Sequence, residues 1–129
     1  MTRRLSNNER IARDMSEAEL KDCVQDALES FGYIWKHDRP ARYADGRVRT
    51  HFEGHAGFPD IVAVHPATGK MLLFELKVEL PSKGKVSDDQ QVWLDAFELS
   101  CEASVASGVW RPSDWLSGVV GETLAWGRR

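Results

Sequence analysis

The sequence predicts an α/β domain, in which strands pack against helices. Two observations support this expectation. Apolar runs at 61–64 and 71–74 are separated by a turn that contains proline and glycine, as in the two strands of a hairpin. Segments 16–31 and 88–101 each begin near a serine suited to helix capping and continue with apolar residues at helical spacing.

Length and composition are those of one globular domain. The 129 residues suffice for a single core, and 42% hydrophobic with 29% charged residues is an ordinary composition. No apolar run reaches membrane-spanning length, and the first residues lack the apolar segment of a secretory signal, so we expect a cytoplasmic protein without a membrane partner. Cys23 and Cys101 are then expected to be thiols rather than a disulfide.

The first helix is predicted from a capping box. Residues 1–15 are polar and are expected to form a flexible N-terminal segment. Ser16 and Glu19 have the spacing of a capping box, and the helix is expected to run to about Phe31. At about 100° per residue, Glu17 falls on the apolar side of this helix. Glu19 is explained by capping, whereas Glu17 is either an inward carboxylate with a partner or an acid favoured by the helix dipole.

A strand at 33–37 is followed by a long loop at 38–57, rich in arginine, histidine and glycine. A loop of this length in a compact domain is usually functional or mobile. His51 and His55 have the spacing of half a zinc site. No second pair of ligands has a matching spacing, so we favour a functional or mobile loop over zinc.

Charged residues at the hairpin indicate the site. Asp60 precedes the first strand, and Glu75 and Lys77 lie on the second. Side chains alternate along a strand, so Glu75 and Lys77 share one face, while Phe74 and Leu76 share the other. Charged groups on an apolar strand are costly to bury unless they are paired or bind something. Two carboxylates beside an ammonium form either a divalent-metal site or a buried ion network, and such networks stabilise poorly.

The second half of the chain continues the pattern. Ser87 is a predicted N-cap, and Gln90 lies in the first turn of the helix that follows. We expect a basic turn, a helix, a strand, a short helix and a C-terminal tail at 78–85, 88–101, 103–110, 111–116 and 119–129.

Several of these residues together form a family signature. Pro59-Asp60 is followed by fourteen residues and then by Glu75-Leu76-Lys77; the flanking motifs, in order, are Gly57-Phe58-Pro59-Asp60, Val86-Ser87 with Gln90 and Trp93, and Val109-Trp110-Arg111-Pro112. Over residues 16–116 the chain resembles the VRR-NUC branch of the PD-(D/E)XK nucleases. The resemblance implies a restriction-endonuclease-like core (αβββαβ) within 16–118, with a central mixed sheet flanked by helices.

The resemblance also implies Mg²⁺- or Mn²⁺-dependent hydrolysis of DNA phosphodiester bonds. Oxygen ligands for such a cation would come from Asp60, Glu75, the carbonyl of Leu76, and Glu17. Lys77 would activate the attacking water or stabilise the phosphate charge. Gln90 would support the water or the substrate.

The net charge of −3 is low for a nucleic-acid binder, but basic residues gather locally. The expected phosphate contacts are Arg39, Arg42, Arg47, Arg49, Lys83 and Lys85. No separate DNA-reading domain is visible, which favours recognition of DNA structure, as in flaps, ends or Holliday junctions.

The family resemblance further implies a homodimer of phage or bacterial origin, in the host cytoplasm if phage-encoded. The alternative function is a non-catalytic DNA-binding or assembly module that keeps the fold. Asp60, Glu75 and Lys77 are all present, which argues against that alternative. Nothing in the sequence separates DNA from RNA as the substrate.

Overall fold

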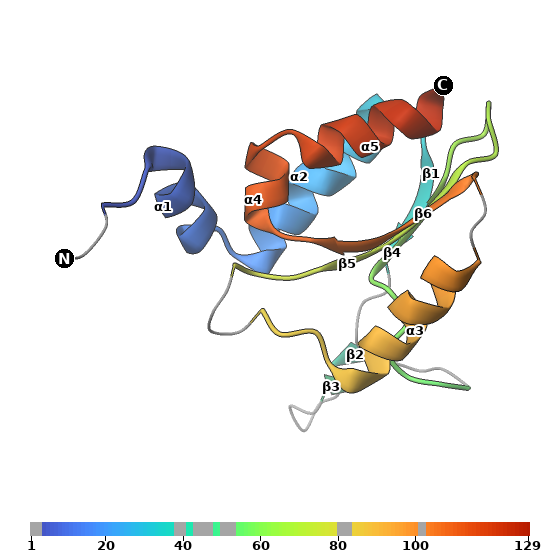
Figure 1. The fold of residues 1–129 in the computed structure, drawn as a ribbon, viewed down its shortest axis with the longest axis horizontal. Coiled ribbons are helices and arrows are strands. Elements are labelled where there is room, and N and C mark those ends of the chain that lie inside the picture. Colours follow the sequence, from blue (N-terminus) through green and yellow to red (C-terminus); the bar gives the residue numbers. More distant parts are fainter. Residues whose placement is uncertain (1–3, 38–40, 43–47, 50–53, 80–83, 101–102) are drawn as a thin grey trace.

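The computed structural model of the chain describes residues 4–37, 41–42, 48–49, 54–79, 84–100 and 103–129. Within these ranges, helices and strands follow the predicted order, with additional elements at both ends and between β1 and β4 (Figure 1). The elements are α1 (Asn7–Asp14), α2 (Glu17–Ser30), β1 (Ile34–His37), β2 (Ala41–Arg42), β3 (Val48–Arg49), β4 (Ile61–Val64), β5 (Met71–Leu76), α3 (Asp88–Leu99), β6 (Val105–Trp110), α4 (Pro112–Leu116) and α5 (Val119–Arg128).

The central sheet has four strands in the order β1-β4-β5-β6. β1 with β4 and β4 with β5 are antiparallel, whereas β5 with β6 is parallel. Parallel neighbours need a crossover connection, and α3 supplies it. The predicted mixed sheet flanked by helices is therefore confirmed. β2 and β3 form a separate two-stranded sheet inside the long loop.

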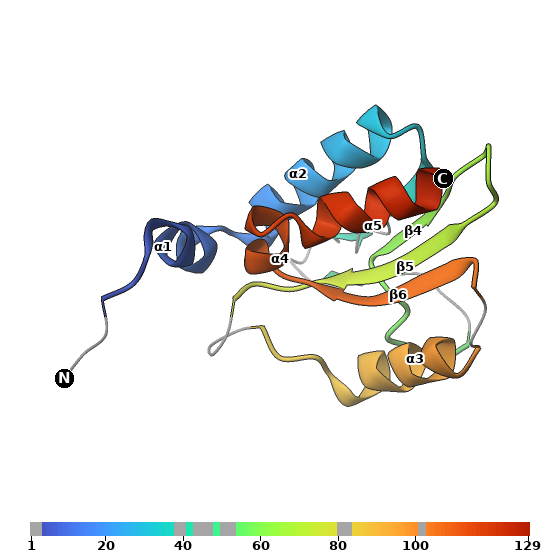
Figure 2. The same cartoon turned by 45° about the horizontal axis from the view of Figure 1, so that its top comes forward.

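Helices cover both faces of the sheet. α2 and α5 lie on one face and α3 on the other, as Figures 1 and 2 both show. Side chains alternate along the strands, so one set from β4 and β5 enters the core beneath α2 and α5, and burial of this apolar surface is the main stabilising term. This core contains Leu20, Val24, Leu28, Ile61, Ala63, Leu72, Phe74, Leu76, Trp110, Val120 and Leu124.

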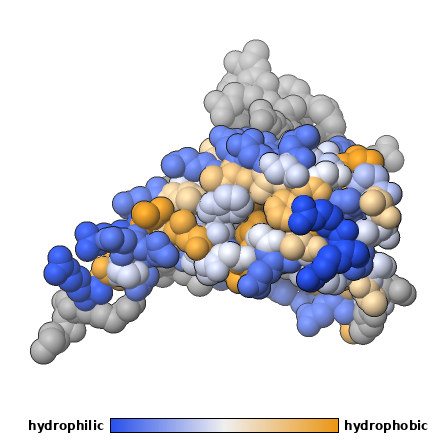
Figure 3. All heavy atoms as spheres, turned by 90° about the horizontal axis from the view of Figure 1, so that it is seen from above, coloured by the Kyte–Doolittle hydropathy of each residue, from blue (hydrophilic) through white to orange (hydrophobic). Residues whose placement is uncertain are grey.

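The expectation of a flexible segment at 1–15 is wrong for Asn7–Asp14, which form α1. Ser6 and Glu9 make a capping box, with Glu9 N–H donating to Ser6 Oγ at 3.2 Å. Ala12 is buried, and α1 extends from the body beside α4 (Figures 1 and 2). Figure 3 shows apolar side chains gathered where α1 meets the body. The capping spacing at Ser6 is the signal that the sequence analysis overlooked.

The C-terminal tail expected at 119–129 is instead helix α5. Val120 and Leu124 are fully buried in the core. The β4–β5 turn caps the far end of the helix, where Lys70 Nζ donates to the carbonyls of Trp126 and Arg129 at 3.1 and 2.8 Å. These contacts satisfy carbonyls that have no partner within the helix, so packing and capping between distant segments stabilise α5.

Tyr33 ties α5 to the strand layer. Its hydroxyl donates to the carbonyl of Leu124 at 2.8 Å. A Cβ on Gly127 would overlap the Tyr33 hydroxyl, so the glycine makes this contact possible. His65 is buried beside Tyr33, with Nε2 bonded to the carbonyl of Phe31 and Nδ1 to the amide of Ala67. With both ring nitrogens occupied, His65 has a structural role.

Candidate active site

The site is built where β4 begins and β5 ends. Ile61 pairs with Phe74 in the antiparallel ladder, so Asp60 lies across from Glu75. The backbone N–H of Leu76 donates to Asp60 Oδ2 at 2.9 Å and holds this carboxylate at the end of β5. The hairpin therefore brings together the two carboxylates that the sequence analysis selected.

Glu75 is buried, with only 3% of its surface exposed. Its Oε1 accepts from Gln90 Nε2 at 2.7 Å, whereas its Oε2 is buried and has no hydrogen-bond partner among the described residues. Burial, followed by the charge and close approach of Asp60, raises the pKa of Glu75 to about 8, and the charge of Lys77 opposes this. Since no described residue donates to Glu75 Oε2, a proton or a cation at this oxygen would relieve the repulsion between the two carboxylates.

Gln90 connects α3 to Glu75. Its Oε1 accepts from the N–H of Ser87 at 2.9 Å, and its own N–H donates to Ser87 Oγ at 3.2 Å, which completes a capping box. The Nε2 group is left to donate to Glu75. A glutamate could complete the same cap but would have no donor for Glu75 when ionised. The oxygen and the nitrogen of the Gln90 side-chain amide therefore both have partners, and the hydrogen bond from Ser87 fixes the orientation of the amide.

The segment before Asp60 packs against α3. Gly57 has φ +94°, and a Cβ there would lie 2.5 Å from the carbonyl carbon of Asp89. Trp93 Nε1 donates to the carbonyl of Ala56 at 2.9 Å, and Phe58 packs edge-on against the Trp93 ring at 5.0 Å. These contacts set the spacing between the first carboxylate and α3. Gly57 and Trp93 were predicted only as residues of the family motif, and their structural role becomes visible in the fold.

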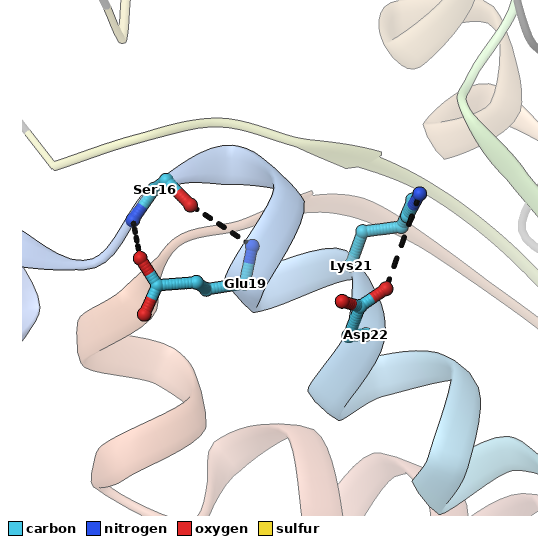
Figure 4. Close-up of polar contacts among 4 residues, drawn as sticks. All are labelled: Ser16, Glu19, Lys21 and Asp22. Carbon is cyan, nitrogen blue, oxygen red and sulfur yellow. Dashed lines mark hydrogen bonds and ion pairs between the residues drawn. The ribbon is translucent and has the colours of Figure 1, made fainter.

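Glu17 lies at the start of α2 on the side of the carboxylate pair. Its pKa is raised first by partial desolvation and then by the charge of Asp60, while the charge of Lys77 lowers it. The Glu17 side chain is exposed, so its link to the site is electrostatic: the charges of Asp60 and Lys77 both act on its carboxylate. Glu19 instead accepts from the N–H of Ser16 at 3.3 Å in the capping box (Figure 4). The capping role expected of Glu19 agrees with the structure, whereas Glu17 is exposed and its inward orientation and partner stay predictions.

Lys77 is half-buried just beyond β5, and its N–H donates to the carbonyl of Trp110 at 3.0 Å. Its charge acts on both Glu17 and Glu75. Among the described residues the Lys77 ammonium has no ion pair within 4.0 Å. The arrangement therefore differs from the buried ion network considered as an alternative.

Comparison with known proteins identifies the family. A family model of the VRR-NUC domain matches residues 15–110. The chain belongs to the VRR-NUC family. A solved structure described as a VRR-NUC domain has a TM-score of 0.51 and 19% identity, over 80% of this chain and 92% of that chain, which shows the fold alone. Among curated proteins, no match was found.

Membership makes this a nuclease-type domain. The VRR-NUC match runs from just before α2 to the end of β6, so α1, α4 and α5 lie outside it. In the part of the chain that the structure describes, no helix is long and apolar enough to cross a membrane.

The VRR-NUC site offers oxygen ligands that suit a hard divalent cation. The buried Glu75 Oε2, which lacks a donor beside Asp60, fits such an ion. Within the described ranges no three His, Cys, Asp or Glu side chains lie close enough to hold a metal together. A cation held by this pair would keep several waters, as Mg²⁺ commonly does. Ligation by Glu17 and by the Leu76 carbonyl stays a prediction.

The predicted phosphate contacts are only partly covered by the structure. Lys85 is exposed between β5 and α3. Arg42 and Arg49 lie on β2 and β3, where Arg42 pairs with Val48 in the ladder. The other predicted DNA contacts and one histidine of the half zinc site lie outside the described residues, namely Arg39, Arg47, Lys83 and His51.

Proposed function

We propose that this protein is a Mg²⁺- or Mn²⁺-dependent endodeoxyribonuclease. The observation that supports the proposal most is the buried Glu75 Oε2, which has no hydrogen-bond donor among the described residues while the charge of Asp60 acts on the same carboxylate. A divalent cation at that point would remove the repulsion that raises the pKa of Glu75. The hydrogen bonds from Leu76 and Gln90 occupy one oxygen of each carboxylate and leave the other pair of oxygens for the ion.

Hydrolysis needs a water that attacks phosphorus, a departing 3′ or 5′ oxygen, and relief of phosphate charge. A cation held by Asp60 and Glu75 would supply Lewis-acid polarisation and would lower the pKa of its bound water. Lys77 would orient the attacking water and stabilise charge on the phosphate. Gln90 would keep Glu75 in a single orientation, and Glu17 would hold further water at the mouth of the site.

The proposed substrate is branched or flapped DNA, cut by a homodimer as in Holliday-junction resolvases. One chain presents one carboxylate pair, and a two-fold dimer would place two such pairs on one symmetric junction. The proposed setting is the bacterial cytoplasm, including that of a phage-infected host. Salt dependence tests the basic surface: neutralising Arg42, Arg47, Lys83 and Lys85 together should lower the slope of log affinity against log salt by about one per lost contact.

The decisive test compares Asp60→Asn with the wild-type protein on linear, flapped and four-way DNA and on RNA, in Mg²⁺, Mn²⁺ and EDTA. Asp60→Asn should lose cleavage and keep its fold and DNA affinity. Asp22→Asn is the matched control, because Asp22 is 74% exposed on the outer side of α2. Full activity in Asp60→Asn would refute the metal assignment. DNA binding without cleavage under any metal condition would favour the non-catalytic module.

A further inference from the structure

We propose that Arg111 binds a backbone phosphate of the DNA next to the scissile one; this inference rests on the proposed function. Arg111 directly follows β6, whose register with parallel β5 pairs Trp110 with Leu76. The carboxyl ends of parallel neighbours meet at one edge of a sheet, and Lys77 N–H donates to the Trp110 carbonyl there. Arg111 therefore lies at the same edge as the carboxylate pair.

The Arg111 guanidinium has donors to spare. It is half-buried, and Nη1 donates to the carbonyl of Val78 at 2.7 Å. Asp114 Oδ2 accepts from the backbone N–H of Arg111 and not from its guanidinium. Among the described residues the guanidinium has no carboxylate partner. A half-buried cation without a counter-charge favours an external anion, and the planar fork of arginine matches a phosphate bidentately.

The guanidinium is also set in place before any substrate arrives. Gly84 is buried, and a Cβ at this position would overlap both the Val78 carbonyl and Arg111 Nη1. The glycine thus opens the space that the guanidinium occupies, and the Val78 carbonyl fixes its direction. A preoriented fork loses less conformational freedom on binding a phosphate than a mobile surface lysine.

The place of the Arg111 guanidinium in the fold favours a DNA phosphate as the anion that it binds. Lys77 lies one residue before Val78, so the guanidinium is anchored to the backbone beside the proposed water-activating group. A DNA strand whose scissile phosphate lies at Asp60 and Glu75 would place the next phosphate of the same strand at this edge of the sheet. Arg111 would then act in binding and register, as a residue that positions the strand for cleavage.

The first test compares Arg111→Gln with Arg128→Gln, a control that removes the same charge from α5, where Arg128 lies over the Phe31 ring. Affinity for a flapped duplex is measured in EDTA at several salt concentrations. Arg111→Gln should bind about 10- to 100-fold more weakly, with a salt slope lower by about one. The control should keep the wild-type slope. Thermal unfolding of both variants is measured alongside.

A second test locates the phosphate. Duplexes that carry one neutral methylphosphonate at a time should show one position at which wild-type affinity falls and Arg111→Gln affinity does not. If Arg111→Gln fails to fold, phenylglyoxal labelling of the wild-type protein replaces it: DNA should protect Arg111 from modification and leave Arg128 reactive.

The outcomes are separable. Normal DNA binding by Arg111→Gln, or a lower melting temperature with an unchanged salt slope, would overturn this inference and leave the nuclease proposal intact, since Arg111 would then be only a structural tie to Val78. Labelling of Arg111 that DNA does not reduce would have the same meaning. Absence of DNA binding by the wild-type protein would overturn the proposed function and this inference with it.

Discussion

Replacing Glu75 by glutamine should stabilise the metal-free protein. Burial and Asp60 raise the pKa of Glu75 from its ordinary value of 4.5 to about 8. A carboxyl with a raised pKa contributes its full stability below pH 4.5 and loses it as the pH rises toward 8. At about 1.4 kcal/mol per pH unit, ionisation of Glu75 lowers the free energy of unfolding by roughly 3 kcal/mol at pH 7 and by about 5 kcal/mol at pH 9, relative to its value below pH 4.5.

Glutamine keeps the acceptor for Gln90 and gains an N–H that can donate to Asp60. Glu75→Gln should therefore be more stable than wild type in EDTA, by about 3 kcal/mol at pH 7, and this difference should shrink toward pH 4.5. Urea unfolding in EDTA between pH 5 and pH 9 measures it. Glu122→Gln is the matched control, because Glu122 is exposed on α5.

Added Mg²⁺ should reverse the order, since only the wild-type site would bind the ion and gain stability from it. The reasoning would be refuted by a Glu75→Gln protein that is less stable than wild type in EDTA at pH 8. It would equally be refuted by a wild-type stability that rises over the same interval while the glutamine variant stays flat.

The remaining predictions concern Lys77, whose catalytic role is proposed, and two glycines. Lys77→Ala should lower single-turnover cleavage in Mg²⁺ by about 10²–10⁴-fold. It should change the melting temperature in EDTA little, because no described residue forms an ion pair with Lys77. A large fall in melting temperature with wild-type cleavage would contradict this. Gly57→Ala should lower the free energy of unfolding by about 2–5 kcal/mol, through a strained backbone and a clash with Asp89, and urea unfolding that matches wild type would disprove the clash. Gly127→Ala should lower the free energy of unfolding by about 1–3 kcal/mol, because the new methyl group displaces the Tyr33 hydroxyl. Adding Tyr33→Phe should recover part of that loss. Purely additive effects of the two substitutions in a double-mutant cycle would rule out the contact.

The carboxylate pair could be predicted from the sequence because its geometry is local. A short turn between two apolar runs fixes the hairpin, and the hairpin places Asp60 across from Glu75. The capping role of Glu19 also followed from local spacing, because Ser16 and Glu19 are three residues apart. The placement of Asp60 across from Glu75 agrees with the structure, whereas the inward orientation of Glu17 and the catalytic roles of all these residues stay predictions.

The parts that were missed depend on contacts between distant segments. α5 contains Gly121 and Gly127 in a short span, which lowers its helix propensity, and its stability comes from core packing and from Lys70 in the hairpin turn. The fit of Arg111 against Gly84 joins a residue before α3 to one after β6, and no spacing in the sequence indicates it. α1 is different, because its Ser6 capping signal was present and was overlooked.

The double use of Gln90 has an evolutionary consequence. Glutamine and glutamate codons differ by a single base, and either residue can complete a capping box with serine. A Gln90→Glu descendant would keep α3 capped and the sheet covered, while a third carboxylate would face Glu75. Such a lineage would retain a folded protein and lose the proposed chemistry in one step. Relatives with glutamate at this position should therefore be assayed for cleavage before they are counted as active nucleases.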